Sequence, residues 1–243
     1  MSNPRFFCPE KLAPGATVRL PERAAHHAQR VLRMQAGDTL TLFNGDGHNY
    51  SGELIRVGKD EVSAKIAAQS AAQNESPLRV TLAQAISSGD RMDFTLQKAV
   101  ELGIDAIQPL AAERSVVKLS GERAEKRREH WQNVVISACE QSGRAVVPAV
   151  AAPMPFSHWL GQPADFAQKI MLSPSAEQNL HHLSQPTGPV CLLIGCEGGF
   201  SPQEMQAAAS CGYTPVRLGS RVLRTESAAL AALAALQTLW GDF

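Results

Sequence analysis

The sequence lacks the features that mark a membrane or secreted protein. It contains no apolar run of about 18 residues, the length that a membrane-spanning helix needs. Its start, MSNPRFFCPEKL, has no apolar signal core, so we expect a cytoplasmic protein without a membrane partner. The five cysteines are scattered and show no CxxC spacing, which argues against a disulfide framework or a zinc site.

The sequence also lacks an excess of charge of either sign. It has 23 Lys and Arg residues against 23 Asp and Glu residues, so the formal net charge is zero. Nucleic-acid-binding proteins usually carry a basic excess, so bulk charge alone does not indicate such a partner and does not exclude one. Hydrophobic residues make up 44% and charged residues 19%, which is typical of a folded globular protein.

The first part of the chain has the pattern of a small β-rich domain. Residues 22–34 carry apolar side chains at helical spacing, and Asn44-Gly45-Asp46-Gly47 is typical of a tight turn. Short strands with a turn between each pair favour a small barrel. Residues 67–77 are small and polar, so we interpret them as a linker and place the domain boundary after residue 72. The strands are expected at residues 39–43, 51–57 and 61–66, with a turn at 58–60 between the last two.

The rest of the chain, residues 73–243, alternates between strand and helix patterns. This alternation predicts an α/β fold in which helices cover both faces of a mainly parallel sheet. Apolar runs predict strands at residues 79–86, 104–110, 169–173, 190–196 and 215–218. Helical spacing predicts helices at residues 88–103, 122–142, 202–210 and 225–240.

Ligands of such sheets bind beyond the carboxyl ends of the strands, and three loops of this chain follow predicted strands. They are residues 171–174, 195–200 and 218–226. Glycines in these loops allow a close approach of backbone to a ligand, although glycine after a strand is also common in simple turns. The string GCEGGF has neither the GxGxxG spacing of dinucleotide-binding proteins nor the Lys-Ser/Thr of a P-loop, so it argues against a dehydrogenase or NTPase.

Two strings near the C-terminus carry a resemblance to a known family. GCEGGFSPQE, followed by LGSRVLRTESAALAAL, resembles the SPOUT class of methyltransferases, and most closely the ribosomal RNA small-subunit methyltransferase E family. Further strings stand in the same order as in that family, and together they extend the resemblance over the whole chain. They are Arg5-Phe6-Phe7, His26-His27, Gln97-Lys98 with Glu101-Leu102-Gly103, Glu113-Arg114-Ser115 and Glu140-Gln141-Ser142-Gly143-Arg144.

The resemblance implies a fold and an activity that composition could not indicate. It implies a PUA-like RNA-binding barrel over residues 1–72 and a SPOUT methyltransferase domain with a trefoil knot over residues 73–243. It further implies a homodimer that transfers methyl from S-adenosylmethionine to N3 of a uridine in 16S rRNA of the small ribosomal subunit, with no metal. The chain departs from the family pattern at Cys196, where proline is usual, and at Ser227, where alanine is usual. Both residues are small enough to fit, although losing proline relaxes the backbone.

The same resemblance assigns roles to individual residues. Arg224 would stabilise a developing uracil anion or bind a phosphate, unless it only forms a surface ion pair. Glu226 or Glu197 would take the N3 proton, and the sequence does not choose between them, since Glu226 also suits a helix N-terminus. Expected contacts to S-adenosylmethionine, largely through the backbone, are Leu172, Ser173, Gly195, Glu197, Gly198, Gly199, Leu218, Gly219, Leu223, Arg224 and Thr225. Expected RNA contacts are Arg5, His26, Arg30, Arg33, Arg114, Lys118 and Arg144.

Two other functions remain open at this point. A SPOUT enzyme of this kind could instead methylate a ribose 2′-hydroxyl or a tRNA. The same fold could also serve a non-catalytic RNA-binding or ribosome-assembly factor. The predicted N-terminal barrel and the EQSGR string favour the rRNA base family, and the loop glycines together with Arg224 argue against loss of catalysis.

Overall fold

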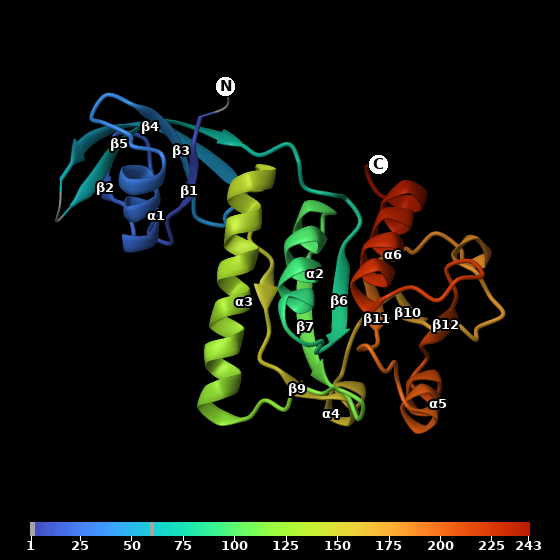
Figure 1. Ribbon diagram of the computed structural model, residues 1–243. Helices are drawn as coiled ribbons and strands as arrows, with labels where there is room; N and C mark the ends of the chain where they lie inside the picture. Colours follow the sequence, from blue (N-terminus) through green and yellow to red (C-terminus); the bar gives the residue numbers. More distant parts are fainter. Residues whose placement is uncertain (1–2, 59–60) are drawn as a thin grey trace. The chain divides into compact units, whose positions relative to one another are not determined.

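The computed structural model describes residues 3–58 and 61–243, which divide into two compact units (Figure 1). The first unit comprises the chain up to Glu75 together with Cys139–Val147. The second comprises Ser76–Ala138 and Pro148–Phe243. The chain therefore contributes to the first unit twice, which hydrophobic periodicity does not indicate.

The first unit is built on a five-stranded sheet with one parallel pair, β1 with β3, and otherwise antiparallel pairs. The strand order is β1 (Arg5–Phe7), β3 (Thr39–Phe43), β4 (His48–Val57), β5 (Val62–Ala71) and β2 (Thr17–Arg19). Helix α1 (Glu22–His26) continues into a π-helical turn, η1 (His27–Val31). The predicted helix and strands are thus confirmed, whereas β1 and β2 were missed because three residues are too few to show an alternating pattern.

The interpretation of residues 67–77 as a linker is wrong for its first part. Strand β5 continues to Ala71, which pairs with His48 of β4. The side chains of residues 67–71 are all exposed, so the strand has no apolar alternation there and backbone pairing alone defines it. Of the predicted turn at 58–60, Lys59 and Asp60 lie outside the described residues.

An ion pair between buried Arg144 and half-buried Glu75 helps to hold the returning segment within the first unit. The Arg144 guanidinium, which is 5% exposed, lies 2.6 Å from the Glu75 carboxylate through its NH2 group. The other oxygen of Glu75 accepts a hydrogen bond from the backbone N–H of Val146. A paired and hydrogen-bonded charge is stable in the interior, whereas either partner alone would be costly.

The second unit contains a parallel sheet whose strands all end at one edge. Strands β6 and β11 are central and almost entirely buried, which explains their nearly continuous apolar sequences. The order is β12 (Thr214–Val216), β10 (Gln168–Leu172), β11 (Val190–Ile194), β6 (Val80–Ala85), β7 (Ala106–Ala111) and β8 (Ala149–Val150), and β9 (Met154–Pro155) also pairs with β7.

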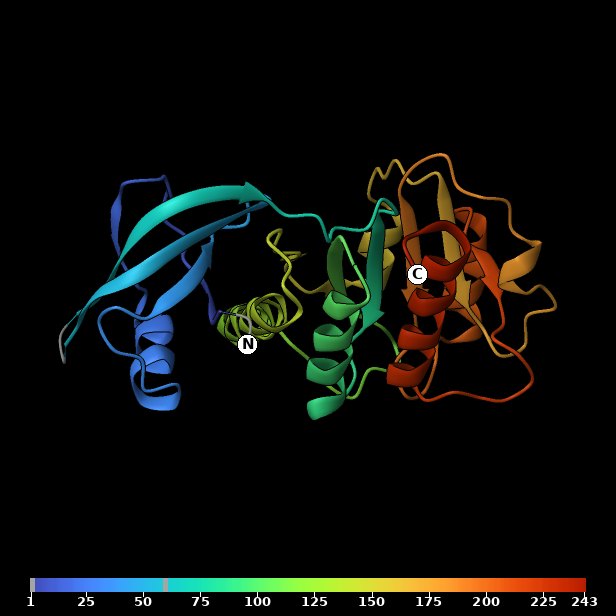
Figure 2. The ribbon, with the colours of Figure 1, turned by 90° about the horizontal axis from the view of Figure 1, so that it is seen from above.

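Helices cover both faces of this sheet, as the alternation predicts. Figures 1 and 2 show α2 (Asp90–Glu101) and α6 (Thr225–Trp240) side by side on one face. On the other face, Phe156 of α4 (Phe156–Leu160) and Ala208 of α5 (Pro202–Ser210) pack into one cluster with Ala83 and Leu193 of the sheet. The α/β fold class is therefore confirmed.

The remaining elements are one long helix and a short 3-10 turn. Helix α3 (Gly121–Ser142) matches the prediction for residues 122–142, and η2 (Leu180–His182) lies in the loop after β10. The short strands β8 and β9 and helix α4 were not predicted. In the described ranges, no helix combines the length and apolarity that crossing a membrane requires.

Candidate functional site

The candidate site lies at the carboxyl edge of the second unit's sheet, where the strand order reverses. From β6 the chain moves outward to β7 and β8, then crosses to β10, and returns to place β11 between β10 and β6. Such a reversal leaves a crevice beyond the strand ends, the usual ligand position in open α/β sheets. The three loops singled out from the sequence follow β10, β11 and β12, so all three begin at this edge.

The loop after β11, residues 195–200, is a tight turn that requires glycine at two positions. Gly199 has φ +65°, and its N–H donates to the carbonyl of Cys196 at 2.9 Å. A Cβ on Gly195 would lie 3.0 Å from the Gly199 Cα, so the two backbones touch. Cys196, which replaces the usual proline, is buried and its thiol donates to the Gly199 carbonyl at 3.6 Å. The departure from the family pattern therefore adds a contact within the turn.

Two buried side chains join this loop to the start of α6. The Thr225 hydroxyl donates to the carbonyl of Gly195 at 2.6 Å. The Gln84 side-chain amide, from β6, donates to Thr225 Oγ1 at 3.1 Å. Thr225 was expected at the site, whereas Gln84 was missed. A signal was present, because Gln84 is the one amide side chain in the apolar run VTLAQAI.

Glu197 is held by residues from the end of β6 and the start of α2. Its Oε1 accepts from the Ser88 N–H at 2.9 Å, the Ser88 hydroxyl at 2.7 Å and Arg91 NH1 at 2.8 Å. Burial raises the pKa of the Glu197 carboxyl, but these hydrogen bonds more than offset it and bring the pKa to about 2. Neither Ser88 nor Arg91 was expected at the site. Glu197 is therefore an ionised carboxylate that fixes the loop.

This arrangement predicts how Glu197 contributes to stability as pH changes. Since the folded pKa lies near 2, below the ordinary 4.5, the contribution is complete above pH 4.5 and disappears as pH falls towards 2. In Glu197→Gln the melting temperature should therefore lie below that of the wild type by a constant margin at neutral pH. The margin should shrink between pH 4.5 and 2. Thermal melts between pH 7 and pH 2 test this prediction, with Glu177→Gln, a variant at an exposed glutamate, as control. A difference in melting temperature that does not change with pH would contradict it.

Arg114, expected to contact RNA, contacts the same loop. Its NH1 donates to the carbonyl of Gly198 at 2.9 Å, and a Cβ on Gly198 would lie 3.1 Å from the Arg114 Cβ. Lys118, further along the same connection, is exposed. Loop 195–200 is thus held through Gly195, Glu197 and Gly198 by residues from separate elements.

The other two loops complete the edge. The Ser173 N–H donates to the carbonyl of Val216 at 2.9 Å, which joins the ends of β10 and β12. Gly219 has φ +75°, a conformation that side chains other than glycine rarely adopt. The three leucines expected to contact the cofactor are half-buried, which leaves part of each side chain accessible: Leu172, Leu218 and Leu223.

The catalytic candidates Arg224 and Glu226 stand on either side of Thr225. Arg224 is the N-cap of α6 and is exposed. Glu226 lies in the first turn of α6, where the helix dipole favours a carboxylate. Its Oε2 is buried and has no hydrogen-bond partner among the described residues. The structure thus places an exposed cation and, among the described residues, an unpaired carboxylate oxygen at the start of one helix.

The RNA candidates of the first unit fall into two groups. His26, Arg30 and Arg33 are exposed on or just after α1 and η1, and Arg33 adopts φ +54°. Arg5 instead donates to Asn49 Oδ1 at 2.9 Å and to the Arg144 carbonyl, and Arg144 is in the buried pair described above. Arg5 and Arg144 therefore make hydrogen bonds within the unit, and their assignment as RNA contacts stays a prediction.

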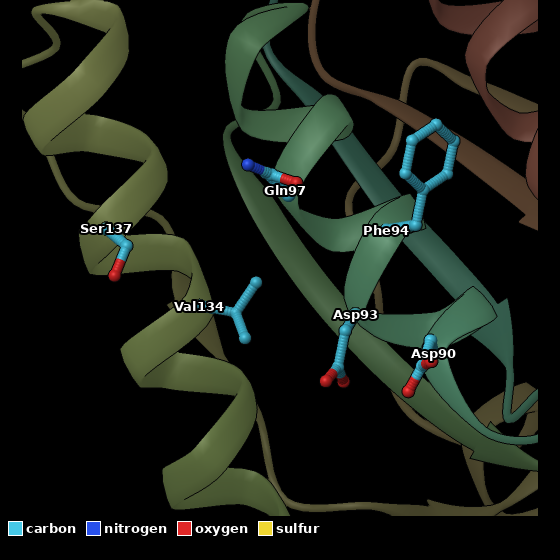
Figure 3. Close-up of a pocket in the computed structure, with 6 residues that line it drawn as sticks. All are labelled: Asp90, Asp93, Phe94, Gln97, Val134 and Ser137. Atoms are coloured by element: carbon cyan, nitrogen blue, oxygen red, sulfur yellow. The ribbon is translucent and has the colours of Figure 1, made fainter.

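A separate surface pocket lies away from these loops. It has a volume of about 410 Å³ and lies between α2 and α3, with Gln97 and Val134 on its walls (Figure 3). Asp93 in this pocket is 2.6 Å from His130 Nε2. None of the catalytic, cofactor-binding or RNA-binding residues expected from the sequence is among those that line it. Among residues 3–58 and 61–243, no group of His, Cys, Asp or Glu side chains is arranged to hold a metal.

Comparisons with known proteins match this chain to RNA methyltransferases. The chain matches the family model described as RNA methyltransferase domain over residues 74–237, and the one described as RNA methyltransferase PUA domain over residues 20–67. It is 35% identical to the ribosomal RNA small subunit methyltransferase E of Buchnera aphidicola, over 98% of this chain and 97% of that protein.

Two solved structures are similar over the full length of both chains. The ribosomal RNA small subunit methyltransferase E of Neisseria gonorrhoeae, bound to S-adenosyl methionine, is 46% identical with a TM-score of 0.92. A Legionella pneumophila protein described as a methyltransferase, in complex with the same cofactor, is 40% identical with a TM-score of 0.96.

Proposed function

Because the chain belongs to the ribosomal RNA small subunit methyltransferase E family, we propose that it transfers methyl from S-adenosylmethionine to N3 of a uridine in 16S rRNA. Family membership makes it an S-adenosylmethionine-dependent RNA methyltransferase. One observation carries the proposal furthest: loop 195–200 forms a tight turn that requires glycine, at the point where the strand order reverses. Uridine N3 as the acceptor atom follows from the resemblance of the sequence motifs.

The residues at this edge fit S-adenosylmethionine. Backbone at Gly199 and Gly219 carries no Cβ and adopts positive φ, so a ligand can approach its N–H and C=O groups closely. The half-buried Leu172, Leu218 and Leu223 offer apolar surface beside them. We propose all the cofactor contacts named from the sequence, with Glu197 acting through its backbone and as a support of the loop. When bound, S-adenosylmethionine supplies an electrophilic sulfonium methyl group.

The acceptor side of the reaction requires a base and a cation. N3 of neutral uridine carries a proton, and its removal leaves a negative charge on the uracil ring. Of the two carboxylates, we propose Glu226 as the base. Glu197 has a pKa near 2 and its Oε1 already accepts three hydrogen bonds, so it is a poor proton acceptor at neutral pH. Exposed Arg224 is the cation that stabilises the developing anion.

The two parts of the chain then have separate tasks. We propose that residues 1–72 bind RNA and residues 73–243 carry out methyl transfer, with the C-terminal segment forming the trefoil knot of the family. Val222, Leu239 and Phe243 are exposed apolar side chains in and beside α6, which supports a homodimer through this region. A small ribosomal subunit as substrate implies a cytoplasmic enzyme.

RNA binding by the first unit is testable at Arg30. Its replacement by alanine removes one exposed cation, so affinity for 16S rRNA should fall and the salt dependence of binding should lose about 0.7–0.9 of a unit in slope. Affinity for S-adenosylmethionine should not change. Filter binding over a range of salt concentrations measures this, with Arg56→Ala as control, since Arg56 is exposed but paired with Glu61. Equal slopes for the two variants would contradict the assignment.

The proposed substrate is tested with methyl-labelled S-adenosylmethionine and ribosomal subunits from a strain that lacks this protein. Label in 16S rRNA of small subunits is the expected result. Label only in tRNA, or in large-subunit rRNA, would keep the chemistry and overturn the substrate. Cofactor binding without label in any RNA would point to an RNA-binding or assembly factor.

A further inference from the structure

We propose that Gln84 is a positioning residue of this site: its side-chain amide orients the Thr225 hydroxyl so that the start of α6 stays joined to loop 195–200. The inference rests on the proposed function, because it assigns Gln84 to the cofactor loop and to the residues beside Thr225. Gln84 does not need to touch the cofactor or the RNA. It acts through Thr225 and Gly195.

The surroundings of Gln84 fix the direction of its amide. The side chain is fully buried in β6, and two of the three atoms that its Nε2 contacts are backbone carbonyl oxygens, which can only accept. Nε2 donates to the Ala85 carbonyl at 2.9 Å and to Thr225 Oγ1 at 3.1 Å, and lies 3.4 Å from the Gly195 carbonyl. A flipped amide would turn its own carbonyl oxygen towards the Ala85 and Gly195 carbonyls, so the hydrogen bonds assign the NH2 group to this side.

The direction of the amide sets the direction of the threonine hydroxyl. Because Oγ1 accepts from Gln84, its own proton is free to point at the Gly195 carbonyl, which lies 2.6 Å away. The chain of donors runs from β6 through α6 to the loop after β11. Arg224 and Glu226 are the residues on either side of Thr225. Loss of the first donor therefore loosens both the cofactor loop and the helix start that carries these two side chains.

Fold stability alone does not account for an amide at this position. Gln84 Oε1 is buried and has no hydrogen-bond partner in the described part of the chain. An unpaired buried acceptor is unfavourable, and an apolar side chain of similar size would pack in a strand whose other buried residues are all apolar. An apolar residue could not donate the hydrogen bond that the amide NH2 group gives to Thr225 Oγ1.

The neighbouring strand provides a matched control. Gln108 of β7 is also buried, and its Nε2 donates to the next carbonyl, Pro109, at 2.9 Å, as Gln84 does to Ala85. Its second acceptor is the Ala152 carbonyl at 3.0 Å, in the connection between β8 and β9. Gln108 thus shares the strand environment and the local hydrogen bond, but contacts none of the loops at the candidate site.

The first experiment compares Gln84→Leu with Gln108→Leu by calorimetric titration of S-adenosylmethionine without RNA. Gln84→Leu should bind about tenfold more weakly than the wild type, the effect of one buried hydrogen-bond relay, and Gln108→Leu should bind within about twofold of it. Melting temperatures of both variants without ligand show whether each is folded. Equal affinities for the two variants would overturn the proposal.

A glutamate at position 84 provides a readout that a packing defect would not produce. An ionised carboxylate cannot donate to Thr225 Oγ1, but the protonated acid can, and burial favours the protonated form. Gln84→Glu should therefore gain affinity for S-adenosylmethionine, relative to the wild type, as pH falls from about 8 to about 6. The affinity of Gln84→Leu divided by that of the wild type should not change over the same pH range. If the affinity of Gln84→Glu relative to the wild type does not change with pH, the role of Gln84 as a hydrogen-bond donor is contradicted.

The route through Thr225 is tested by a double-variant cycle. Thr225→Val removes the hydroxyl, so adding Gln84→Leu to it should weaken binding no further, and Thr225→Ser should bind better than Thr225→Val. Fully additive losses would show that Gln84 acts independently of Thr225 and would overturn the proposal. These binding experiments use no RNA, so their outcome does not depend on the proposed RNA substrate. If the wild type binds the cofactor but methylates no rRNA, the proposed function fails while the role of Gln84 in cofactor binding still stands.

Discussion

Replacement of Arg224 by alanine is expected to lower methylation of 16S rRNA by roughly 10²–10³-fold, the effect of removing one preorganised donor to a developing anion. The side chain is exposed at the N-cap of α6, where it is free to meet the uracil ring. Binding of S-adenosylmethionine should change little, because the contacts proposed for this residue to the cofactor use its backbone. The loss should appear in the rate with saturating RNA.

Arg221→Ala is the matched control for this prediction. Arg221 is an exposed arginine in the same loop and stands three positions earlier in the chain. Its replacement should leave the methylation rate within about threefold of the wild type, as expected for a solvated surface charge. Single-turnover assays on small subunits measure both variants. If both arginines lower the rate to the same extent, the loop only supplies positive charge and Arg224 has no special role.

Replacement of Gly195 by alanine is expected to weaken S-adenosylmethionine binding by roughly 10–100-fold, because a misplacement of less than an ångström at a preorganised site has effects of this order. The added Cβ would lie 3.0 Å from Gly199 Cα and 3.1 Å from its carbonyl carbon. Both are backbone atoms of a turn held on several sides, so the loop itself has to move. Calorimetric titration of the folded variant measures the loss.

Gly212→Ala separates a general effect of adding a side chain from a local one. Gly212 has φ +84° in the turn between α5 and β12, and a Cβ there meets no atom within 4 Å. That variant should lose stability, by about 1 kcal/mol, while its affinity for S-adenosylmethionine stays unchanged. Unchanged affinity in Gly195→Ala, or an equal loss in Gly212→Ala, would contradict the role of loop 195–200.

Much of the second unit could be predicted from the sequence because its strands are buried on both faces. Strand β11 is a continuous apolar run, and α5 carries the Ser201 and Glu204 capping box that marks a helix start. The segment 67–71 could not be predicted, since its strand pairing uses backbone alone and its side chains are exposed. The return of residues 139–147 to the first unit involves contacts between residues far apart in the chain, such as the ion pair between Arg144 and Glu75, 69 positions apart.

The candidate site was predictable where local motifs carried it. Gly195, Gly199 and Thr225 belong to strings that resemble the family, whereas Gln84 and Arg91 reach the site only because β6 pairs beside β11. Such contacts require the sheet order, which periodicity does not provide. The same holds for the pairing of Arg144 with Glu75, because an arginine looks alike in a sequence whether it faces solvent or a carboxylate.

The acceptor atom is tested most directly by reverse transcription of 16S rRNA after methylation of small subunits that lack the modification. Methylation at N3 blocks the Watson–Crick edge, so the account predicts one strong stop beside a single uridine, present with the wild type and lost with Arg224→Ala. Digestion of the same RNA should give the N3-methylated nucleoside. Incorporated methyl without a stop, with the label on a ribose, would contradict the central claim.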